Sequence, residues 1–275
     1  MMRKPKLGQH FLVDDTARLA IVDALGDVSA RTVIEIGAGH GAITSILAAR
    51  CRRLIAFEID TALAAELRFR MREQAHVEIV EADILEVDLA ALIQPGESAD
   101  VVGNLPYYIT SPILMRLFAA GAHSLLARAV LMMQREVADR LSAAPGCREY
   151  GLLSATTQIN ARVETLFTLP PAAFSPPPDV TSSVLRLEFA PRFHELGVDA
   201  AGFDTFLRAC FAHKRKTLAN NLRAAGPSSA RSYTSDELRA AWPAEIPPLA
   251  RAESLALEPL AALYRALAAL RRIAE

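Results

Sequence analysis

Short apolar segments alternate with helical patterns through the first half of the chain, and this alternation limits the fold more than any other feature. Strands are expected at residues 32–36, 54–57, 77–80, 100–102 and 129–133, with helical runs between most of them. Strands that alternate with helices form parallel sheets. The sequence therefore predicts a doubly wound, Rossmann-like α/β sheet whose ligands bind at the carboxyl ends of the strands.

The remainder of the chain predicts an edge hairpin and a second domain. Residues 163–167 and 183–189 are strand-like and flank a proline-rich loop, which favours an antiparallel hairpin at one edge of the sheet. From about Val198 the pattern is purely helical. We expect a first domain over residues 1–192, N-terminal arm included, and a small all-α domain over residues 198–275.

Composition excludes several classes of protein. Hydrophobic residues make up 52% of the chain, which is ample for a sizeable core. No uncharged segment is long enough to span a membrane, and the three cysteines contain no CxxC pair, which argues against a disulfide framework or a thiolate zinc site. We therefore expect a cytoplasmic protein with no membrane contact and no metal. We also expect a monomer.

A glycine-rich loop follows the first strand and predicts a nucleotide-like cofactor. Gly37, Gly39 and Gly41 allow a ligand close to the backbone, ahead of a helix expected from Ala42. The same loop also satisfies the dinucleotide pattern GxGxxG/A, with Glu58 about 20 residues further on. The loop alone therefore leaves the choice between cofactors open.

Acidic residues at the ends of the next two strands favour S-adenosylmethionine. This cofactor carries a ribose diol, an adenine amine and an amino-acid tail, so its site needs hydrogen-bond acceptors beside a loop. Glu58 and Asp83 supply such acceptors at successive strand ends, although each acid alone would often be a helix cap or a solvated charge. Together with the glycine loop, they favour the methyl donor.

The segment Asn104-Leu105-Pro106-Tyr107 follows the fourth strand and is the most informative part of the sequence. Its residues suit the methylation of an adenine N6 amine. That amine is a poor nucleophile, because its lone pair is delocalised into the ring. The Asn104 oxygen and a carbonyl of Leu105 or Pro106 can accept both N6 hydrogens and so favour a pyramidal nitrogen. Tyr107 offers a ring on which an unpaired or flipped base can stack.

Further motifs accompany these two. Residues 8–12 read Gly-Gln-His-Phe-Leu, residues 174–180 read Phe-Ser-Pro-Pro-Pro-Asp-Val, and residues 211–222 form a basic helical segment. With the glycine loop and the Asn-Leu-Pro-Tyr segment, they occur in the same order as in the ribosomal RNA adenine dimethyltransferases. The chain resembles that family over roughly residues 3–225, although Tyr108 stands where the family often has Asn.

The resemblance implies roles for individual residues. Phe174 would form a second aromatic clamp, so that Tyr107 and Phe174 sandwich the target base, whereas the residue alone would read as a core aromatic beside a stiff loop. Ile59 and Ile84 would pack against the cofactor's adenine ring. The implied cofactor site consists of His10, Leu12, Gly37, Gly39, Glu58, Ile59, Asp83, Ile84 and Asn104.

Basic residues of the second domain are candidates for RNA contacts. The formal net charge is −1, so any RNA surface must be local. A cluster of positive charge is often only a solvated face, but this one contains no acidic residue between positions 208 and 223. The candidates are Arg208, Lys214, Arg215, Lys216 and Arg223, with Arg3, Lys4 and Lys6 of the N-terminal arm.

The resemblance implies a reaction and a partner. The chain would use S-adenosyl-L-methionine to dimethylate N6 of two adjacent adenosines near the 3′ end of 16S ribosomal RNA in the small subunit. Three alternatives stay open at this stage: a large-subunit methyltransferase of the antibiotic-resistance type, an assembly factor that binds RNA without catalysis, and a nicotinamide oxidoreductase. The intact Asn104, Tyr107, Glu58 and Asp83 argue against the assembly factor.

Overall fold

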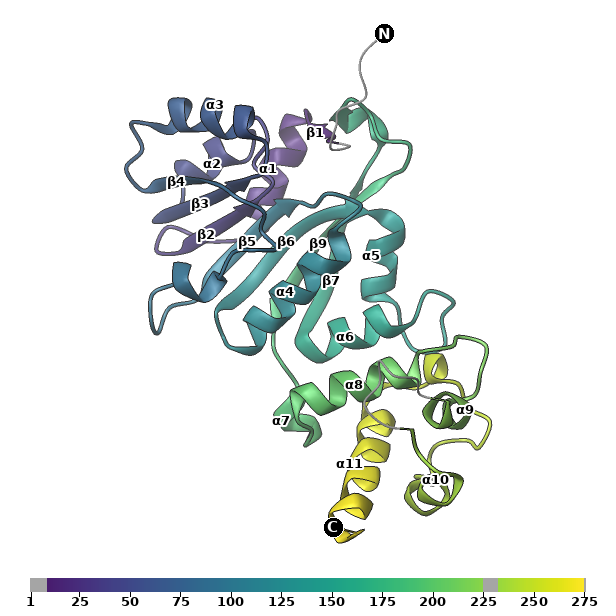
Figure 1. Ribbon diagram of the computed structural model, residues 1–275. Coiled ribbons are helices and arrows are strands. Elements are labelled where there is room, and N and C mark those ends of the chain that lie inside the picture. Colours follow the sequence, from purple (N-terminus) through teal and green to yellow (C-terminus); the bar gives the residue numbers. More distant parts are fainter. Residues whose placement is uncertain (1–8, 225–231, 275) are drawn as a thin grey trace. The chain divides into compact units, whose positions relative to one another are not determined.

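A computed structural model describes residues 9–224 and 232–274 of the chain (Figure 1). The chain divides into two compact units, one of residues 1–138 and 161–189 and the other of residues 139–160 and 190–275. In the part of the chain that is described, no helix has the length and apolar character needed to cross a bilayer.

The first unit is built on a seven-stranded sheet. Its strand order is β4-β3-β2-β5-β6-β9-β7, in which β4 to β6 run parallel and β9 pairs antiparallel with both β6 and β7. The predicted fold class and edge hairpin are therefore confirmed. The strands are β2 (Thr32–Ile36), β3 (Arg53–Glu58), β4 (Val77–Glu81), β5 (Ala99–Asn104), β6 (Leu126–Gln134), β7 (Ala161–Leu169) and β9 (Ser182–Phe189).

Helices connect the parallel strands, as the alternation in the sequence predicts. Asp14 caps the first helix by accepting a hydrogen bond from the Ala17 amide, and Asp60 caps α3 in the same way. The helix after the glycine loop begins at Thr44, later than expected, because the chain first turns at Gly41. Helices α2 (Thr44–Ala48), α3 (Thr61–Met71) and α4 (Thr110–Ala122) lie between parallel strands, and α1 (Asp15–Asp23) precedes them. Helix α5 (Arg135–Ser142) follows β6 and ends in the second unit, and short 3₁₀ turns lie at Leu89–Leu92 and Pro171–Ala173.

Buried side chains on both faces of the sheet hold these layers together. Val33, Leu54 and Val102 point to one face, where they share a core with Ile21 of α1 and Leu47 of α2. Helix α4 packs against β6 and β9. Because both faces are covered, the central strands read as continuous apolar runs.

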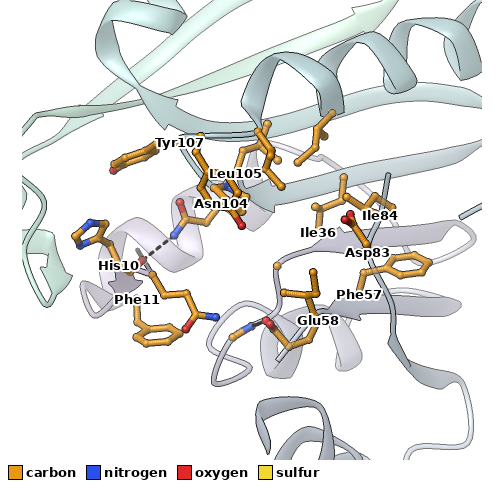
Figure 2. Close-up of a pocket in the computed structure, with 18 of the residues that line it drawn as sticks. His10, Phe11, Ile36, Phe57, Glu58, Asp83, Ile84, Asn104, Leu105 and Tyr107 are labelled. Carbon is orange, nitrogen blue, oxygen red and sulfur yellow. Dashed lines mark hydrogen bonds between the residues drawn. The ribbon is translucent and has the colours of Figure 1, made fainter. Parts of the chain in front are cut away.

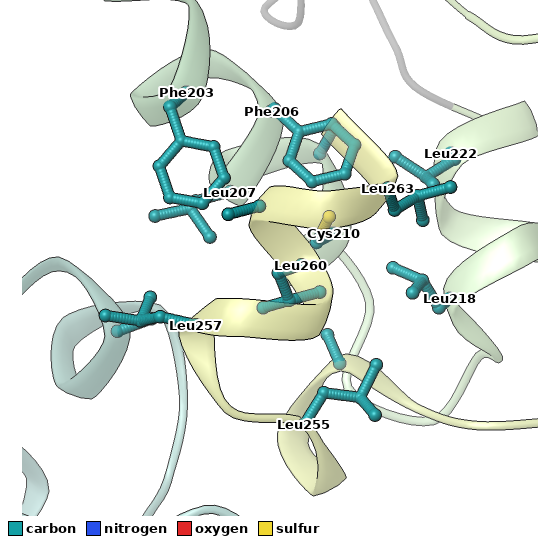
Figure 3. Close-up of a cluster of buried hydrophobic side chains, with 14 of the residues drawn as sticks. Phe203, Phe206, Leu207, Cys210, Leu218, Leu222, Leu255, Leu257, Leu260 and Leu263 are labelled. Atoms are coloured by element: carbon teal, nitrogen blue, oxygen red, sulfur yellow. The ribbon is translucent and has the colours of Figure 1, made fainter. Parts of the chain in front are cut away.

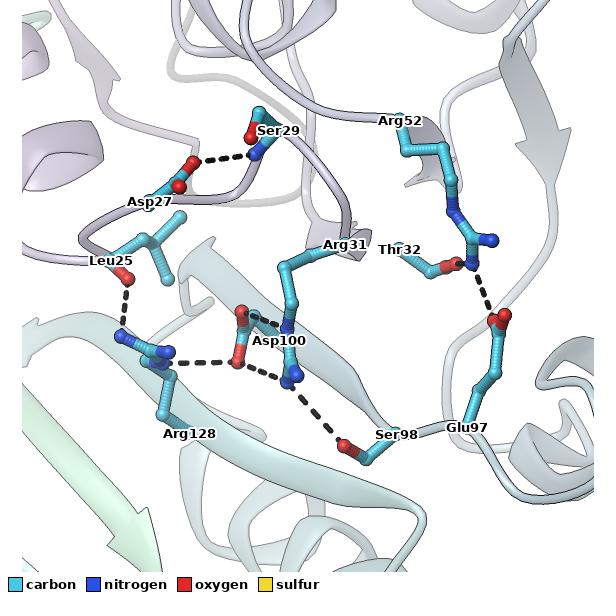
Figure 4. A network of polar contacts seen from close by, with 10 residues as sticks. All are labelled: Leu25, Asp27, Ser29, Arg31, Thr32, Arg52, Glu97, Ser98, Asp100 and Arg128. Atoms are coloured by element: carbon cyan, nitrogen blue, oxygen red, sulfur yellow. Dashed lines mark hydrogen bonds and ion pairs between the residues drawn. The ribbon is translucent and has the colours of Figure 1, made fainter.

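A buried carboxylate on β5 links the segment just before β2 to β6, near the start of these strands (Figure 4). Asp100 is fully buried, and its oxygens accept hydrogen bonds of 3.0 and 3.1 Å from Arg31 and one of 3.1 Å from Arg128. Arg128 also donates to the Leu25 carbonyl after α1. The charge is therefore paired and its hydrogen-bonding capacity is used, which a buried carboxylate requires.

A separate two-stranded sheet brings two distant motifs together. Strand β1 (Phe11–Leu12) pairs antiparallel with β8 (Phe174–Ser175), with Leu12 opposite Phe174. The Val13 amide extends this pairing by donating to the Ala173 carbonyl. The end of the N-terminal motif, Phe11–Leu12, and the start of the proline-rich motif, Phe174–Ser175, thus form one small sheet.

The second unit is helical, with a core of aromatic and leucine side chains that includes Phe203, Phe206 and Leu260 (Figure 3). It differs from the predicted domain in taking residues 139–160, because Ile159 of α6 is buried in this core. Its helices are α6 (Leu152–Asn160), α7 (Phe193–Leu196), α8 (Ala200–Cys210), α9 (Leu218–Arg223), α10 (Ser235–Ala241) and α11 (Leu257–Ala274), with a 3₁₀ turn at Ala252–Ser254.

Candidate functional site

A pocket opens at the carboxyl ends of β2, β3, β4 and β5 (Figure 2). The chain leaves β2 toward β3 on one side and reaches β5 on the other, and such a switch in strand order creates a crevice for ligands. Most residues predicted for cofactor binding or catalysis line this pocket. They are His10, Gly37, Gly39, Glu58, Ile59, Asp83, Ile84, Asn104, Leu105, Pro106 and Tyr107.

The glycine loop adopts backbone conformations that other residues rarely reach. Gly37 has φ of 76° and Gly39 has φ of 55°. A Cβ atom on Gly39 would also lie 3.1 Å from the ring of Phe11. The glycines therefore allow the loop to line the pocket while the Phe11 ring packs directly against its backbone.

Glu58 holds the glycine loop against the end of β3. Glu58 is only 3% exposed; its Oε2 accepts a 2.7 Å hydrogen bond from the Gly39 amide and its Oε1 accepts one of 2.9 Å from the Asp60 amide. Each carboxylate oxygen keeps a further lone pair. Glu58 can therefore position the loop and still accept a hydrogen bond from a ligand hydroxyl.

Asp83 is a partly exposed acceptor in the same pocket (Figure 2). Its Oδ1 accepts a 2.9 Å hydrogen bond from the Leu85 amide, which fixes the carboxylate at the end of β4. No described residue donates to Oδ2. This oxygen is available to an amine or hydroxyl of a ligand.

Asn104 has an orientation that its hydrogen bond determines. Its side-chain nitrogen donates to the His10 carbonyl over 2.9 Å, and only the amide NH₂ can make that bond (Figure 2). The side-chain oxygen points along the other branch and has no donor among the described residues. Asn104 thus joins the N-terminal segment to β5 and presents a free acceptor.

The backbone after Asn104 distinguishes two carbonyls that the sequence leaves equivalent. The Pro106 carbonyl accepts hydrogen bonds from the Ile109 amide, at 3.1 Å, and from the Thr110 hydroxyl, at 3.0 Å. The Leu105 amide is held by Met132, but within the described chain nothing donates to the Leu105 carbonyl. Of the two carbonyls, that of Leu105 is therefore the one open to a ligand.

Tyr107 is fixed at the pocket by its hydroxyl, which lies 2.8 Å from the Ser182 hydroxyl. Burial raises the pKa of the Tyr107 phenol, so the group stays protonated near neutral pH. Its ring stacks on the His10 imidazole with centroids 5.8 Å apart, and His10 Nδ1 lies 2.7 Å from the Pro176 carbonyl. A planar aromatic surface is thus available at the pocket.

Leu12 and Phe174 do not line the pocket, contrary to expectation. They are 5% and 3% exposed and pack in the core beside Leu169. In this structure the Phe174 ring is a core residue, as its residue type alone suggests, and does not face Tyr107 as a clamp. Because Leu12 and Phe174 lie opposite each other in β1 and β8, their side chains share one face of the strand pair, and that face packs into the core.

Phe11 lines the pocket although it was not among the predicted site residues. It packs against His40 with ring centroids 4.5 Å apart. Successive side chains of a strand point to opposite faces, so burial of Leu12 places Phe11 on the pocket side. Ile36, Phe57 and Ile113 form further apolar walls, and the signal for the first two was their position at the ends of apolar strands.

Glu35 is a buried carboxyl beneath this site, on β2. It is 3% exposed, and its Oε2 atom has no hydrogen-bond partner among the described residues. Burial, with a smaller contribution from the charge of Glu58, raises its pKa from 4.5 to about 8. Glu35 is therefore neutral in the folded protein at pH 7.

We expect Glu35→Gln to stabilise the protein increasingly as the pH rises. The folded state binds a proton that the unfolded state releases above pH 4.5, so wild-type stability falls between about pH 4.5 and 8, by up to about 1.4 kcal/mol per pH unit. Glutamine cannot ionise. Melting temperatures of both proteins from pH 5 to 9 measure the effect, and a difference that does not grow with pH would contradict it.

The predicted RNA-binding residues differ in how free they are. Arg208 pairs with Asp204, which lies just outside the basic segment, and Lys214 donates to the Arg148 carbonyl. Arg215 and Lys216 are exposed, and no described residue pairs with them. Arg223 donates to Ser235 and Asn220, whereas Arg3, Lys4 and Lys6 lie outside the described residues.

Comparison with known proteins gives consistent results. The family model "Ribosomal RNA adenine dimethylase" matches residues 2–262. Proteins named ribosomal RNA small subunit methyltransferase A from Acidobacterium capsulatum and Koribacter versatilis are 56% and 51% identical to the chain; the matches cover 96% of it and 91% and 94% of the relatives.

Solved structures share the fold. A dimethyladenosine transferase from Plasmodium falciparum superposes with a TM-score of 0.74 at 24% identity, covering 92% of this chain and 96% of the other. The 23S rRNA methyltransferase ErmE superposes with a TM-score of 0.67 at 25% identity, covering 94% and 99%.

Proposed function

Because the chain belongs to the ribosomal RNA adenine dimethylase family, we propose that it transfers methyl groups from S-adenosylmethionine to N6 of two adjacent adenosines near the 3′ end of small-subunit ribosomal RNA. The observation that carries the proposal is the meeting of Asn104, Leu105 and Tyr107 with the glycine loop in one pocket. Two relatives that are more than 50% identical to the chain are named as small-subunit methyltransferases. The 23S rRNA methyltransferase ErmE is only 25% identical, which supports the small subunit as substrate.

The pocket fits S-adenosylmethionine, which supplies a methyl group on a positively charged sulfur. Gly37 and Gly39 line the pocket without side chains, so the cofactor's amino-acid tail can lie close to the backbone. Glu58 and the free Oδ2 of Asp83 can accept hydrogen bonds from ribose hydroxyls and an amine, and their charges complement the cation. The buried Ile84 gives the adenine ring an apolar wall.

The residues after β5 prepare the target amine for attack. The free oxygen of Asn104 and the open carbonyl of Leu105 can accept hydrogen bonds from the two N6–H groups. These bonds localise the nitrogen lone pair and direct it toward the methyl donor. Tyr107 stacks on the base and fixes its plane. The N–C bond forms as the carbon–sulfur bond breaks, and the methylated nitrogen then releases one proton to water. Asn104, Leu105 and Tyr107 keep their protonation states throughout, so they act by orientation and hydrogen bonding.

The exposed cations of the second unit support RNA binding. Arg215 and Lys216 lie in the connection between α8 and α9, free of acidic partners among the described residues, and Lys214 is exposed beside them. Such side chains can neutralise phosphates without reading base sequence. Arg208 is less suited to this role, because Asp204 already pairs with it.

The reaction can be tested with labelled S-adenosylmethionine and immature small ribosomal subunits. We expect transfer of label into N6,N6-dimethyladenosine, identified by mass spectrometry of the nucleosides, at two adjacent positions near the 3′ end of the RNA. Immature large subunits serve as the matched substrate control. Methylation of the large subunit instead, or tight binding of small subunits without transfer, would overturn the proposal.

A further inference from the structure

Tyr108 is an exposed aromatic residue beside the proposed target site. It is 63% exposed, yet it lines the pocket next to Tyr107. The two tyrosines differ in their contacts: the Tyr107 hydroxyl is anchored on Ser182, whereas no ring or polar contact of the Tyr108 side chain is found among the described residues. Tyr108 therefore presents aromatic surface that the fold itself does not use.

The backbone that carries Tyr108 is firmly held on both sides. Before it, the Leu105 amide donates to the Met132 carbonyl over 2.9 Å. After it, the Ile109 amide and the Thr110 hydroxyl both donate to Pro106. Helix α4 begins at Thr110, and burial of this residue fixes the start of the helix. The position of the Tyr108 Cα is thus set before any ligand arrives, which lowers the entropy that binding would cost.

We propose that Tyr108 is a stacking platform for the nucleotide next to the adenosine in the pocket. The inference rests on the proposed function, in which the substrate contains two adjacent adenosines and one enters at a time. Stacking of a base on an exposed aromatic ring is tolerant of sequence and is a general means of holding single-stranded RNA. An adjacent purine offers a large flat surface to such a ring.

This assignment gives Tyr108 a different role from Tyr107. Tyr107 supports the base that reacts, whereas Tyr108 holds its neighbour and thereby fixes which nucleotide enters the pocket. Loss of the platform should weaken the RNA complex and slow the second adenosine's entry more than the chemical step. The expected signature is a change in KM for RNA with little change in kcat.

The experiment compares Tyr108→Ala with Tyr108→Phe on immature small subunits. We expect alanine to raise KM for RNA about tenfold, within the usual range for losing one stacked base, and to increase the share of RNA with only one dimethylated adenosine. Phenylalanine keeps the ring and should stay within about twofold of wild type. Phe69→Ala is the matched control, since Phe69 is 70% exposed on α3 and does not line the pocket.

Three measurements decide the outcome. An unchanged KM in Tyr108→Ala would overturn the inference, as would an equal effect in Phe69→Ala. Weaker binding of S-adenosylmethionine by Tyr108→Ala, measured without RNA, would also overturn it, because Tyr108 would then serve the cofactor. Absence of methyl transfer by the wild-type protein would instead remove the proposed function itself, so the two failures are distinguishable.

Discussion

Asn104→Ala is expected to lower kcat on small-subunit RNA by at least about 100-fold, the scale of losing a hydrogen-bond acceptor that acts in the transition state. The Asn104 oxygen has no donor in the described protein, whereas its nitrogen is already bound to His10. The oxygen can therefore receive an N6 hydrogen of the target base. Its loss leaves the nitrogen lone pair delocalised and the base poorly aligned for attack.

The Asn104 side chain also holds the N-terminal segment, so a second variant must separate the two roles. Asn104→Asp keeps an oxygen that accepts the N6 hydrogen but cannot donate to the His10 carbonyl. We expect it to retain clearly more activity than the alanine variant. Single-turnover rates and calorimetric binding of S-adenosylmethionine measure the split between chemistry and binding.

Two results would contradict this assignment of Asn104. Equal losses of rate and cofactor affinity in the alanine variant would make Asn104 a binding residue. Equal inactivity of the alanine and aspartate variants would show that the contact with His10, rather than the free oxygen, sustains the reaction. Both variants keep β5 and its neighbours intact, so their melting temperatures should stay close to that of wild type.

Local patterns predicted most of the sheet, and the exceptions have identifiable causes. Strand β2 begins and ends as predicted, because it is apolar and bounded by polar and glycine residues. Strand β6 extends back to Leu126, past Arg128, whose charge hid its place in the sheet; the partner that makes this position favourable, Asp100, lies 28 residues earlier. Such a pairing cannot be read from a local window.

Helix α6 was not predicted, because Ser, Thr and Asn residues interrupt its apolar pattern. The structure shows how these polar residues are accommodated in a buried helix. The Thr157 hydroxyl donates to the Leu153 carbonyl, and the side-chain NH₂ of Asn160 donates to the Thr156 carbonyl. Bonds to carbonyls one turn earlier satisfy the side chains internally, so the helix can be buried despite its composition.

The site was predicted best where a motif lies on one strand end and worst where distant segments meet. Asn104, Glu58 and Asp83 follow apolar strands and line the pocket. The inward orientation of Phe174 depends on pairing with Leu12, 162 positions earlier in the chain, and nothing in either motif shows which face of the pair is buried. The family resemblance identified both segments. The pairing of β1 with β8 in the structure was needed to show which side chains of each segment are buried.

Asp100→Ala is expected to destabilise the first unit by about 3–5 kcal/mol, the usual cost of removing one partner of a buried ion pair. Asp100 is fully buried, and it accepts hydrogen bonds from both Arg31 and Arg128 (Figure 4). Without the carboxylate, two guanidinium groups near the start of β5 lose their shared counter-charge. The side-chain link from β5 to β6 and to the segment before β2 is then lost, although the backbone pairing of β5 with β6 remains.

A second arginine–carboxylate pair nearby provides the matched control for Asp100. Arg52 and Glu97 are bonded at 2.5 Å, but their side chains are 46% and 32% exposed (Figure 4). Glu97→Ala should therefore cost far less stability than Asp100→Ala, because solvent screens an exposed pair. Urea unfolding followed by circular dichroism measures both variants, while fluorescence of Trp242, the only tryptophan, reports on the helical unit. Similar losses in the two variants would show that burial does not set the strength of the Asp100 network.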